Sequence, residues 1–201
     1  MPWLAVGLLV SFLAIVLVTA IRYANHRHEI FRNAWRDYAS SRGLTWNASA
    51  GPWYRRSSHA IEGSVDGEPV RVDTYVVSTG KSTTIFTRVR ANLARPSPAK
   101  VVATRRNFLT GIAEKLGRRT IATGDSGFDA LYALRSKEPA TALALFDERA
   151  RVEARKIGRR VSILVKQGEV KLTWHGMETD PSVLDATCGT ASAIARASAN
   201  A

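Results

Sequence analysis

Two aspartates four residues apart are the first candidates for chemistry in this chain. Asp125 and Asp129 lie in the segment TGDSGFD, between strand-like stretches. Their carboxylates could bind a hard cation, but such an ion takes roughly six oxygen ligands, and Glu138 is the one other acid nearby. Aspartates also accept hydrogen bonds from their own backbone in turns, and glycines supply the positive φ angles that turns require. We therefore expect a structural turn here, with Asp125 and Asp129 as alternative metal ligands.

Other motifs that would indicate catalysis are incomplete. The letters TGKST at Thr79–Thr83 match the end of a P-loop, but a P-loop needs a glycine where this chain has Tyr75. A strand-like stretch follows, so no helix N-terminus would face a phosphate, and we expect a hairpin tip. The histidines fit no metal or nucleophile motif: His26, His28, His59 and His175. The sequence thus nominates no catalytic residue and no cofactor, and it favours a non-catalytic protein while leaving enzyme activity uncertain.

The region around the two aspartates resembles a group of bacterial proteins. A TGD-x-x-FD pattern is followed by an apolar stretch that ends at Ser136, by a Glu-Pro pair with a helix, and by a hairpin. This order is similar to uncharacterised membrane-anchored proteins in which one N-terminal transmembrane helix precedes a domain of unknown function. The resemblance covers residues 123–175 best and residues 35–72 more loosely. It implies an architecture and no activity, so it transfers no catalytic residue.

An apolar stretch from Trp3 to Ile21 precedes all of these motifs. It contains no charged residue, and as a helix it would extend roughly 28 Å, close to the thickness of a bilayer core. We expect an uncleaved transmembrane anchor. Cations follow this stretch and none precedes it, which predicts a single-pass inner-membrane protein with its N-terminus outside and its domain in the cytoplasm. A single cysteine, Cys188, agrees with a reducing compartment. The cations expected to lie nearest to lipid are Arg22, Arg27, Arg32 and Arg36.

The rest of the chain has the patterns of an α+β domain. Alternating apolar residues predict an antiparallel meander over 59–93 and a second hairpin over 160–174. Asp180 before Pro181 predicts the start of a last helix. The predicted fold class is α+β, with an N-terminal transmembrane helix followed by one domain that has a mostly antiparallel sheet and a C-terminal helix. The predicted segments are an anchor at 1–24, a basic amphipathic juxtamembrane helix at 25–43, the domain at 44–196 and a frayed tail at 197–201.

The patterns between the two hairpins are less regular. They predict a strand over 101–104 and a short helix over 106–116 that ends before Gly117. Residues 128–135 look extended. A long helix is expected from Pro139 to Ile157, because proline suits its first turn and apolar residues recur at helical spacing.

The charge of the chain suggests what its partners are. The formal net charge is +12, and arginines outnumber lysines. The first hypothesis is a membrane-anchored, non-catalytic interaction or scaffolding protein, whose basic domain lies near the bilayer and contacts anionic lipid headgroups or an unidentified acidic protein. The second is a membrane-tethered nucleic-acid-binding protein, and the third is an enzyme or cation site at Asp125 and Asp129. Contacts with nucleic acid or an acidic partner are expected from four arginine pairs: Arg55 and Arg56, Arg105 and Arg106, Arg118 and Arg119, and Arg159 and Arg160.

Overall fold

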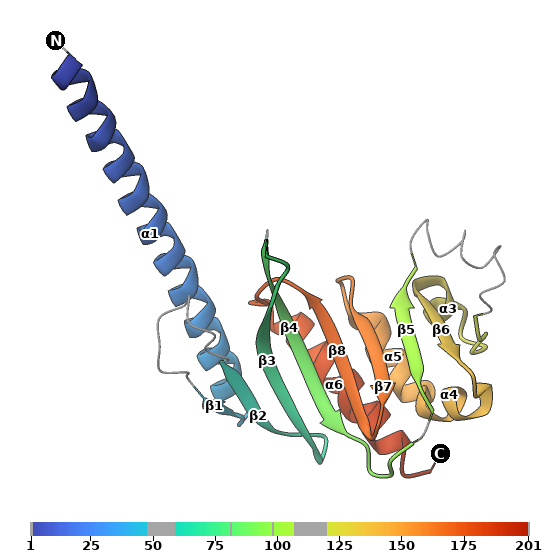
Figure 1. The fold of residues 1–201 in the computed structure, drawn as a ribbon. Helices are drawn as coiled ribbons and strands as arrows, with labels where there is room; N and C mark the ends of the chain where they lie inside the picture. Colours follow the sequence, from blue (N-terminus) through green and yellow to red (C-terminus); the bar gives the residue numbers. More distant parts are fainter. Residues whose placement is uncertain (1, 48–58, 81, 98, 107–119, 201) are drawn as a thin grey trace.

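The computed structural model contains one eight-stranded antiparallel sheet in the strand order β1-β2-β3-β4-β8-β7-β5-β6 (Figure 1). The structure describes residues 2–47, 59–80, 82–97, 99–106 and 120–200, with side chains from residue 11 onward. The predicted α+β class and antiparallel sheet are confirmed. The strands are β1 (Thr45–Asn47), β2 (Ala60–Val65), β3 (Glu68–Ser78), β4 (Thr83–Asn92), β5 (Val101–Arg105), β6 (Tyr132–Ser136), β7 (Ser162–Lys166) and β8 (Glu169–His175).

The N-terminal helix α1 (Pro2–Ser41) projects away from the sheet (Figure 1). Within the described part of the chain, no helix combines the length and the apolar character that a membrane span requires. The predictions of a transmembrane helix and of a single-pass inner-membrane protein with a cytoplasmic domain were therefore wrong.

Two predicted hairpins are confirmed, and their turns explain their register. Asp66 and Gly67 connect β2 to β3, with φ angles of 53° and 88°. Gln167 and Gly168 connect β7 to β8, with φ angles of 54° and 78°. Two successive positive φ angles are typical of the two-residue type I′ turn, whose twist matches that of the paired strands. The predicted hairpin tip at Thr79–Thr83 is also confirmed, because Thr79 N donates to Ser82 O at 3.0 Å between β3 and β4.

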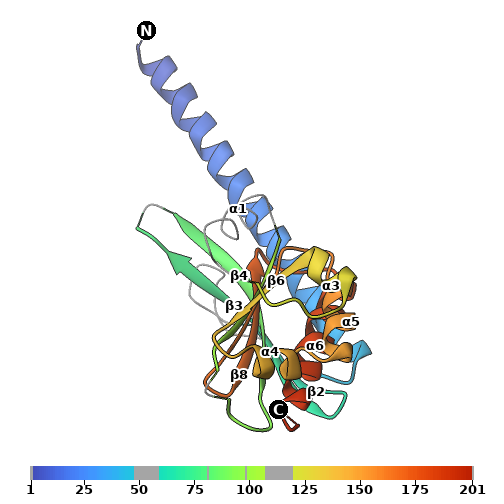
Figure 2. The same ribbon diagram turned by 90° about the vertical axis from the view of Figure 1, so that its right-hand side faces the viewer.

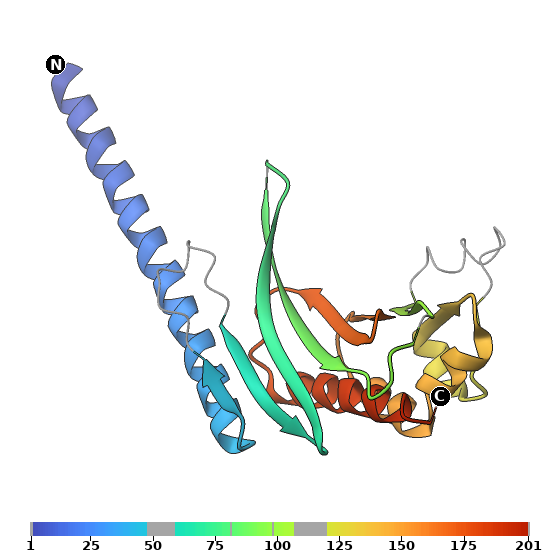
Figure 3. The same cartoon turned by 60° about the horizontal axis from the view of Figure 1, so that its bottom comes forward.

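One face of the sheet packs against helix α6 (Pro181–Ala197), as Figure 3 shows. The helix begins where the sequence predicts, since the Asp180 carboxylate accepts a hydrogen bond from Ser182 N at 2.9 Å. Apolar side chains at matching register positions cross the sheet on this face. They are Ile61, Val72, Val89, Leu172 and Ile163, each at most 1% exposed.

The C-terminal half of α1 docks onto the domain beside β1. Phe31, Trp35 and Tyr38 follow one another at helical spacing, and all three are buried. The indole Nε1 of Trp35 donates to the backbone carbonyl of Glu178 at 2.6 Å. The helix ends before Gly43, whose φ of +65° is the left-handed conformation typical of a helix C-terminus.

Three short helices lie on the same side as α6, near β6 (Figure 2). They are α3 (Ser126–Leu131), α4 (Pro139–Leu145) and α5 (Glu148–Lys156).

The prediction that residues 128–135 are extended was wrong in its first half, where α3 forms. The prediction of one helix over 139–157 was also wrong, because the Asp147 carboxylate accepts from Ala150 N at 2.8 Å and caps a new helix. The predicted helix at 106–116 lies outside the described residues after Arg106.

Candidate functional site

The sheet face opposite α6 carries polar and aromatic side chains, and no described helix covers it (Figures 2 and 3). We call it the open face. Strand register places its side chains in rows across β2, β3, β4 and β8. One row is Glu62, Arg71, Arg90 and Lys171; the next contains Asp73, Arg88 and Thr173; the third is Tyr75, Phe86 and His175.

A buried carboxylate organises the cations of the open face. Asp73 is only 2% exposed, and it accepts hydrogen bonds from Arg88 Nε at 2.7 Å and from Arg88 Nη2 at 2.9 Å. Arg90 Nη2 donates to it at 2.7 Å, and Arg71 Nε lies at 3.4 Å. Burial alone raises the pKa of Asp73, but the hydrogen bonds and charges of Arg88 and Arg90 outweigh burial and hold that pKa below its ordinary value. Asp73 thus stays ionised and fixes three guanidinium groups in place.

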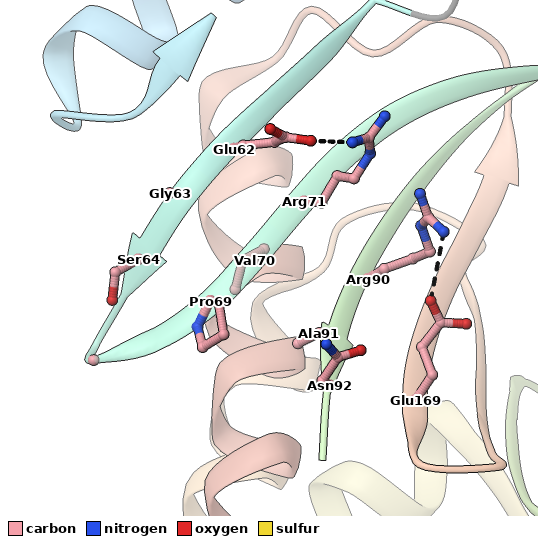
Figure 4. Close-up of a pocket in the computed structure, with 11 residues that line it drawn as sticks. Glu62, Gly63, Ser64, Pro69, Val70, Arg71, Arg90, Ala91, Asn92 and Glu169 are labelled. Carbon is pink, nitrogen blue, oxygen red and sulfur yellow. Dashed lines mark hydrogen bonds and ion pairs between the residues drawn. The ribbon is translucent and has the colours of Figure 1, made fainter. Parts of the chain in front are cut away.

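A hollow of about 670 Å³ lies beside these cations over β2, β3 and β4 (Figure 4). Arg71 and Arg90 line it, and each forms an ion pair within it. Arg71 pairs with Glu62, and Arg90 Nη1 lies 3.6 Å from Glu169 Oε1. All four side chains are between about a quarter and two-fifths exposed. Exposed ion pairs contribute roughly 0 to 1 kcal/mol, so other carboxylates can replace these two at little cost.

Aromatic rings occupy the neighbouring part of the open face. The Tyr75 and Phe86 rings stack with their centroids 5.3 Å apart and an interplanar angle of 18°. The guanidinium carbon of Arg88 lies 4.9 Å from the centre of the Tyr75 ring. Tyr75 is therefore in contact with both a ring and a cation, which stabilises the position of Arg88.

The two aspartates of the TGDSGFD segment make local structural contacts. Asp125 accepts from Phe128 N at 3.0 Å, which caps α3, and its carboxylate lies 3.2 Å from Arg155 Nη1. Asp129 accepts from the backbone N–H of Thr123 at 3.0 Å and from its hydroxyl at 2.9 Å. Across the residues with described side chains, no three His, Cys, Asp or Glu come together to hold a metal ion.

The structure brings two of the predicted arginine pairs together. Arg105 Nη1 donates to the carbonyls of Ile157 at 2.6 Å and Arg159 at 2.8 Å, so the pairs at 105–106 and 159–160 are neighbours. Arg106 Nε donates to Asp129 O at 2.7 Å. The pairs at 55–56 and 118–119 lie outside the described residues. The predicted lipid-proximal residues Arg22, Arg27, Arg32 and Arg36 all lie along α1.

Sequence reasoning did not select Arg71, Asp73, Arg88 and Arg90 as site residues. The sequence did contain a signal for them, because the alternation of apolar and polar residues along 70–77 and 84–93 places these four side chains on the face opposite the apolar ones. The missing information was register, since only the pairing of β3 with β4 places Arg88 directly across from Asp73.

Comparison with known proteins adds little beyond this geometry. No protein-family model matches the chain, and no curated protein matches it either. Among solved structures, the fold is similar to the crystal structure of the mycobacterial trehalose monomycolate transport factor A, TtfA. The TM-score is 0.44 and the sequence identity is 11%, over 79% of this chain and 91% of that chain. A likeness at this score does not identify a function.

Proposed function

We propose that the protein is a non-catalytic interaction module whose open face binds an acidic segment of a partner protein. The observation that carries this proposal is the arrangement of Arg71 and Arg90 around the hollow. Their positions are fixed by the buried carboxylate of Asp73, while their exposed partners, Glu62 and Glu169, are replaceable. Carboxylates of a partner can take the places of these two, and fixed guanidinium groups lose little conformational entropy on binding.

The net charge of the whole chain favours the same partner. At +12, the protein attracts acidic molecules over a distance of about 8–10 Å at moderate salt, which raises the association rate. Lys171 continues the row of Arg71 and Arg90 across the sheet, so the cationic surface extends beyond the hollow.

The test is a titration of the full-length chain with a short peptide of alternating Glu and Gly, followed by calorimetry over a series of salt concentrations. Lys171→Glu reverses a charge on the open face without removing a ligand of Asp73. We expect this variant to bind about five-fold or more weakly, because one favourable charge contact becomes repulsive. Lys137→Glu, on an exposed turn after β6, is the matched control and should bind within about two-fold of the wild type. Equal losses in the two variants would contradict the proposal.

Nucleic-acid binding is a second candidate, favoured by the contact between the 105–106 and 159–160 arginine pairs. Three of these side chains already have partners: Arg105 and Arg106 donate to carbonyls, and Arg159 Nε lies 3.1 Å from Glu178 Oε2. Arg160 is exposed. If duplex DNA binds there, Arg160→Glu should weaken binding and flatten its dependence on salt, while Lys171→Glu should change it less.

A further inference from the structure

A second cavity, separate from the open face, lies between α1 and the hairpin of β3 and β4. Its volume is about 640 Å³. Thr74 and Val76 of β3 and Ile85 of β4 line it from the sheet, and Ala24 and Phe31 line it from α1. The strand residues lie on the same face of the sheet as α6, in a part of that face that α6 does not cover. We call this cavity the α1 pocket.

The apolar side chains of the α1 pocket are incompletely covered. Val76 is 44% exposed and Ile30 is 49% exposed, although both lie beside buried core residues such as Phe31. Volumes of roughly 300 to 1,000 Å³ with mainly apolar walls and a few polar groups are typical of sites for small molecules. A ligand with an apolar body would cover these side chains and remove their surface from water.

The polar groups of the α1 pocket favour an anion. Arg27 lines it, and the described residues of its lining include no Asp or Glu. Arg27 forms no ion pair with any described residue, unlike the arginines of the open face. The Nε2 atoms of His28 and His59, which also line the pocket, lie 3.4 Å apart. Charge complementarity therefore points to a ligand with a single negative group at the Arg27 side.

We propose that the α1 pocket binds an apolar monocarboxylate, such as a fatty acid. The hydrocarbon chain lies against Phe31, Val76 and Ile85, and the carboxylate accepts a charge-assisted hydrogen bond from Arg27. This site is independent of the open face, so either assignment can fail without the other.

The test uses the full-length chain and three probes with the same hydrocarbon chain: dodecanoate, dodecanol and dodecyltrimethylammonium. Each is titrated below its micelle concentration and followed by calorimetry. We expect dodecanoate to bind with one-to-one stoichiometry and about ten-fold or more tightly than the other two, the factor that one charge-assisted hydrogen bond provides. Equal affinity for the three probes, or several molecules bound per chain, would overturn the proposal, because either result means adsorption to exposed apolar surface.

Two matched pairs of variants locate the binding on α1. Arg27→Gln should lower the affinity for dodecanoate about ten-fold and leave that for dodecanol unchanged, whereas Arg22→Gln, outside the pocket, should change neither by more than about two-fold. Ala24→Phe fills the pocket and should abolish binding, while Ala20→Phe adds the same ring to the exposed part of the helix. Thermal unfolding confirms that each variant is folded. Equal effects within either pair would overturn the assignment.

Discussion

Asp73 is the residue on which the cations of the open face depend. We expect Asp73→Asn to lower the free energy of unfolding by about 2 to 4 kcal/mol at neutral pH, because the buried side chain would no longer neutralise Arg88 and Arg90. Urea denaturation measures this loss. Asp37→Asn, at an exposed position on α1, is the matched control and should change stability by less than about 0.5 kcal/mol. A similar small change in Asp73→Asn would mean that the cluster contributes little to the fold.

His59 makes the stability of the protein depend on pH. It is 3% exposed and stacks on Trp46 with ring centroids 5.3 Å apart. Burial, together with the nearby charges of His28 and Arg32, lowers its pKa to about 4. On acidification, the unfolded chain therefore binds a proton at His59 at a higher pH than the folded protein does. The free energy of unfolding should fall as the pH drops from about 6.5 to about 4, by up to roughly 1.4 kcal/mol per pH unit.

The contribution of His59 is measured by comparison with a variant that cannot titrate. Urea denaturation of the wild type and of His59→Phe at a series of pH values gives the free energy of unfolding of each protein as a function of pH. The slopes of the two curves are then compared. The wild type should lose more stability on acidification than the variant does. Parallel curves for the two proteins would show that the His59 ring has the same pKa in the folded and the unfolded chain.

At the scale of single elements, the docking of α1 depends on Trp35. Its indole is fully buried and donates to the carbonyl of Glu178. The Glu178 carboxylate is buried as well and accepts from Trp174 Nε1 at 3.0 Å and from the backbone N–H groups of Thr179 and Asp180. One short segment before α6 therefore connects that helix to α1 and β8.

We expect Trp35→Phe to destabilise the protein by about 2 to 4 kcal/mol, because it leaves a carbonyl without its donor and a gap in the core. Hydrogen exchange should show faster opening of the docked half of α1, around Phe31 to Tyr38, than of β3 and β4. Tyr23→Phe, on the exposed part of the same helix, is the control and should leave both measurements unchanged. Uniform acceleration across the sheet would contradict a local role for Trp35.

The elements that local sequence determines were predicted well. The hairpin turn at Asp66 and Gly67 was recognisable because Asp-Gly is one of the few residue pairs in which both residues readily adopt positive φ angles. The start of α6 was recognisable because Asp180 and Pro181 are typical of a helix N-terminus. The division of 139–157 into two helices was missed because its apolar spacing continues across Asp147, and only the hydrogen bond to Ala150 N reveals the new cap.

The elements and sites that depend on distant contacts were not predicted. Nothing in the local pattern of β4 indicates that its second neighbour is β8, more than seventy residues later in the chain. The open face and the α1 pocket both depend on such pairings. Arg71 and Arg90 become neighbours only through strand register, and Arg27 and Ile85 line the same pocket only because α1 docks beside the sheet.

At the scale of the whole molecule, the pairing of β4 with β8 joins the two halves of the chain into one sheet. Leu172 lies at this junction, opposite Val89, and is fully buried. We expect Leu172→Ala to lower stability by about 2 to 5 kcal/mol and to destabilise both halves together. Fluorescence of the tryptophans near α1 and circular dichroism should then report the same urea midpoint.

The control for this substitution is Leu143→Ala in α4, where the side chain is 37% exposed. It should cost less than about 1 kcal/mol, since less apolar surface is lost. Separate midpoints for the two probes in Leu172→Ala would mean that the halves of the sheet fold independently.

The same strand order has a consequence for the protein during its synthesis. When β4 leaves the ribosome, the edge that β8 will cover is still bare, and the intervening chain takes on the order of ten seconds to translate. Throughout that interval the hairpin of β3 and β4 presents unpaired backbone N–H and C=O groups alongside Val89 and Ala91. An edge of this kind is a template for pairing with another nascent chain. Slowing translation between Asn92 and Glu169 should therefore lower the yield of folded protein, and a chaperone that binds extended segments should restore it.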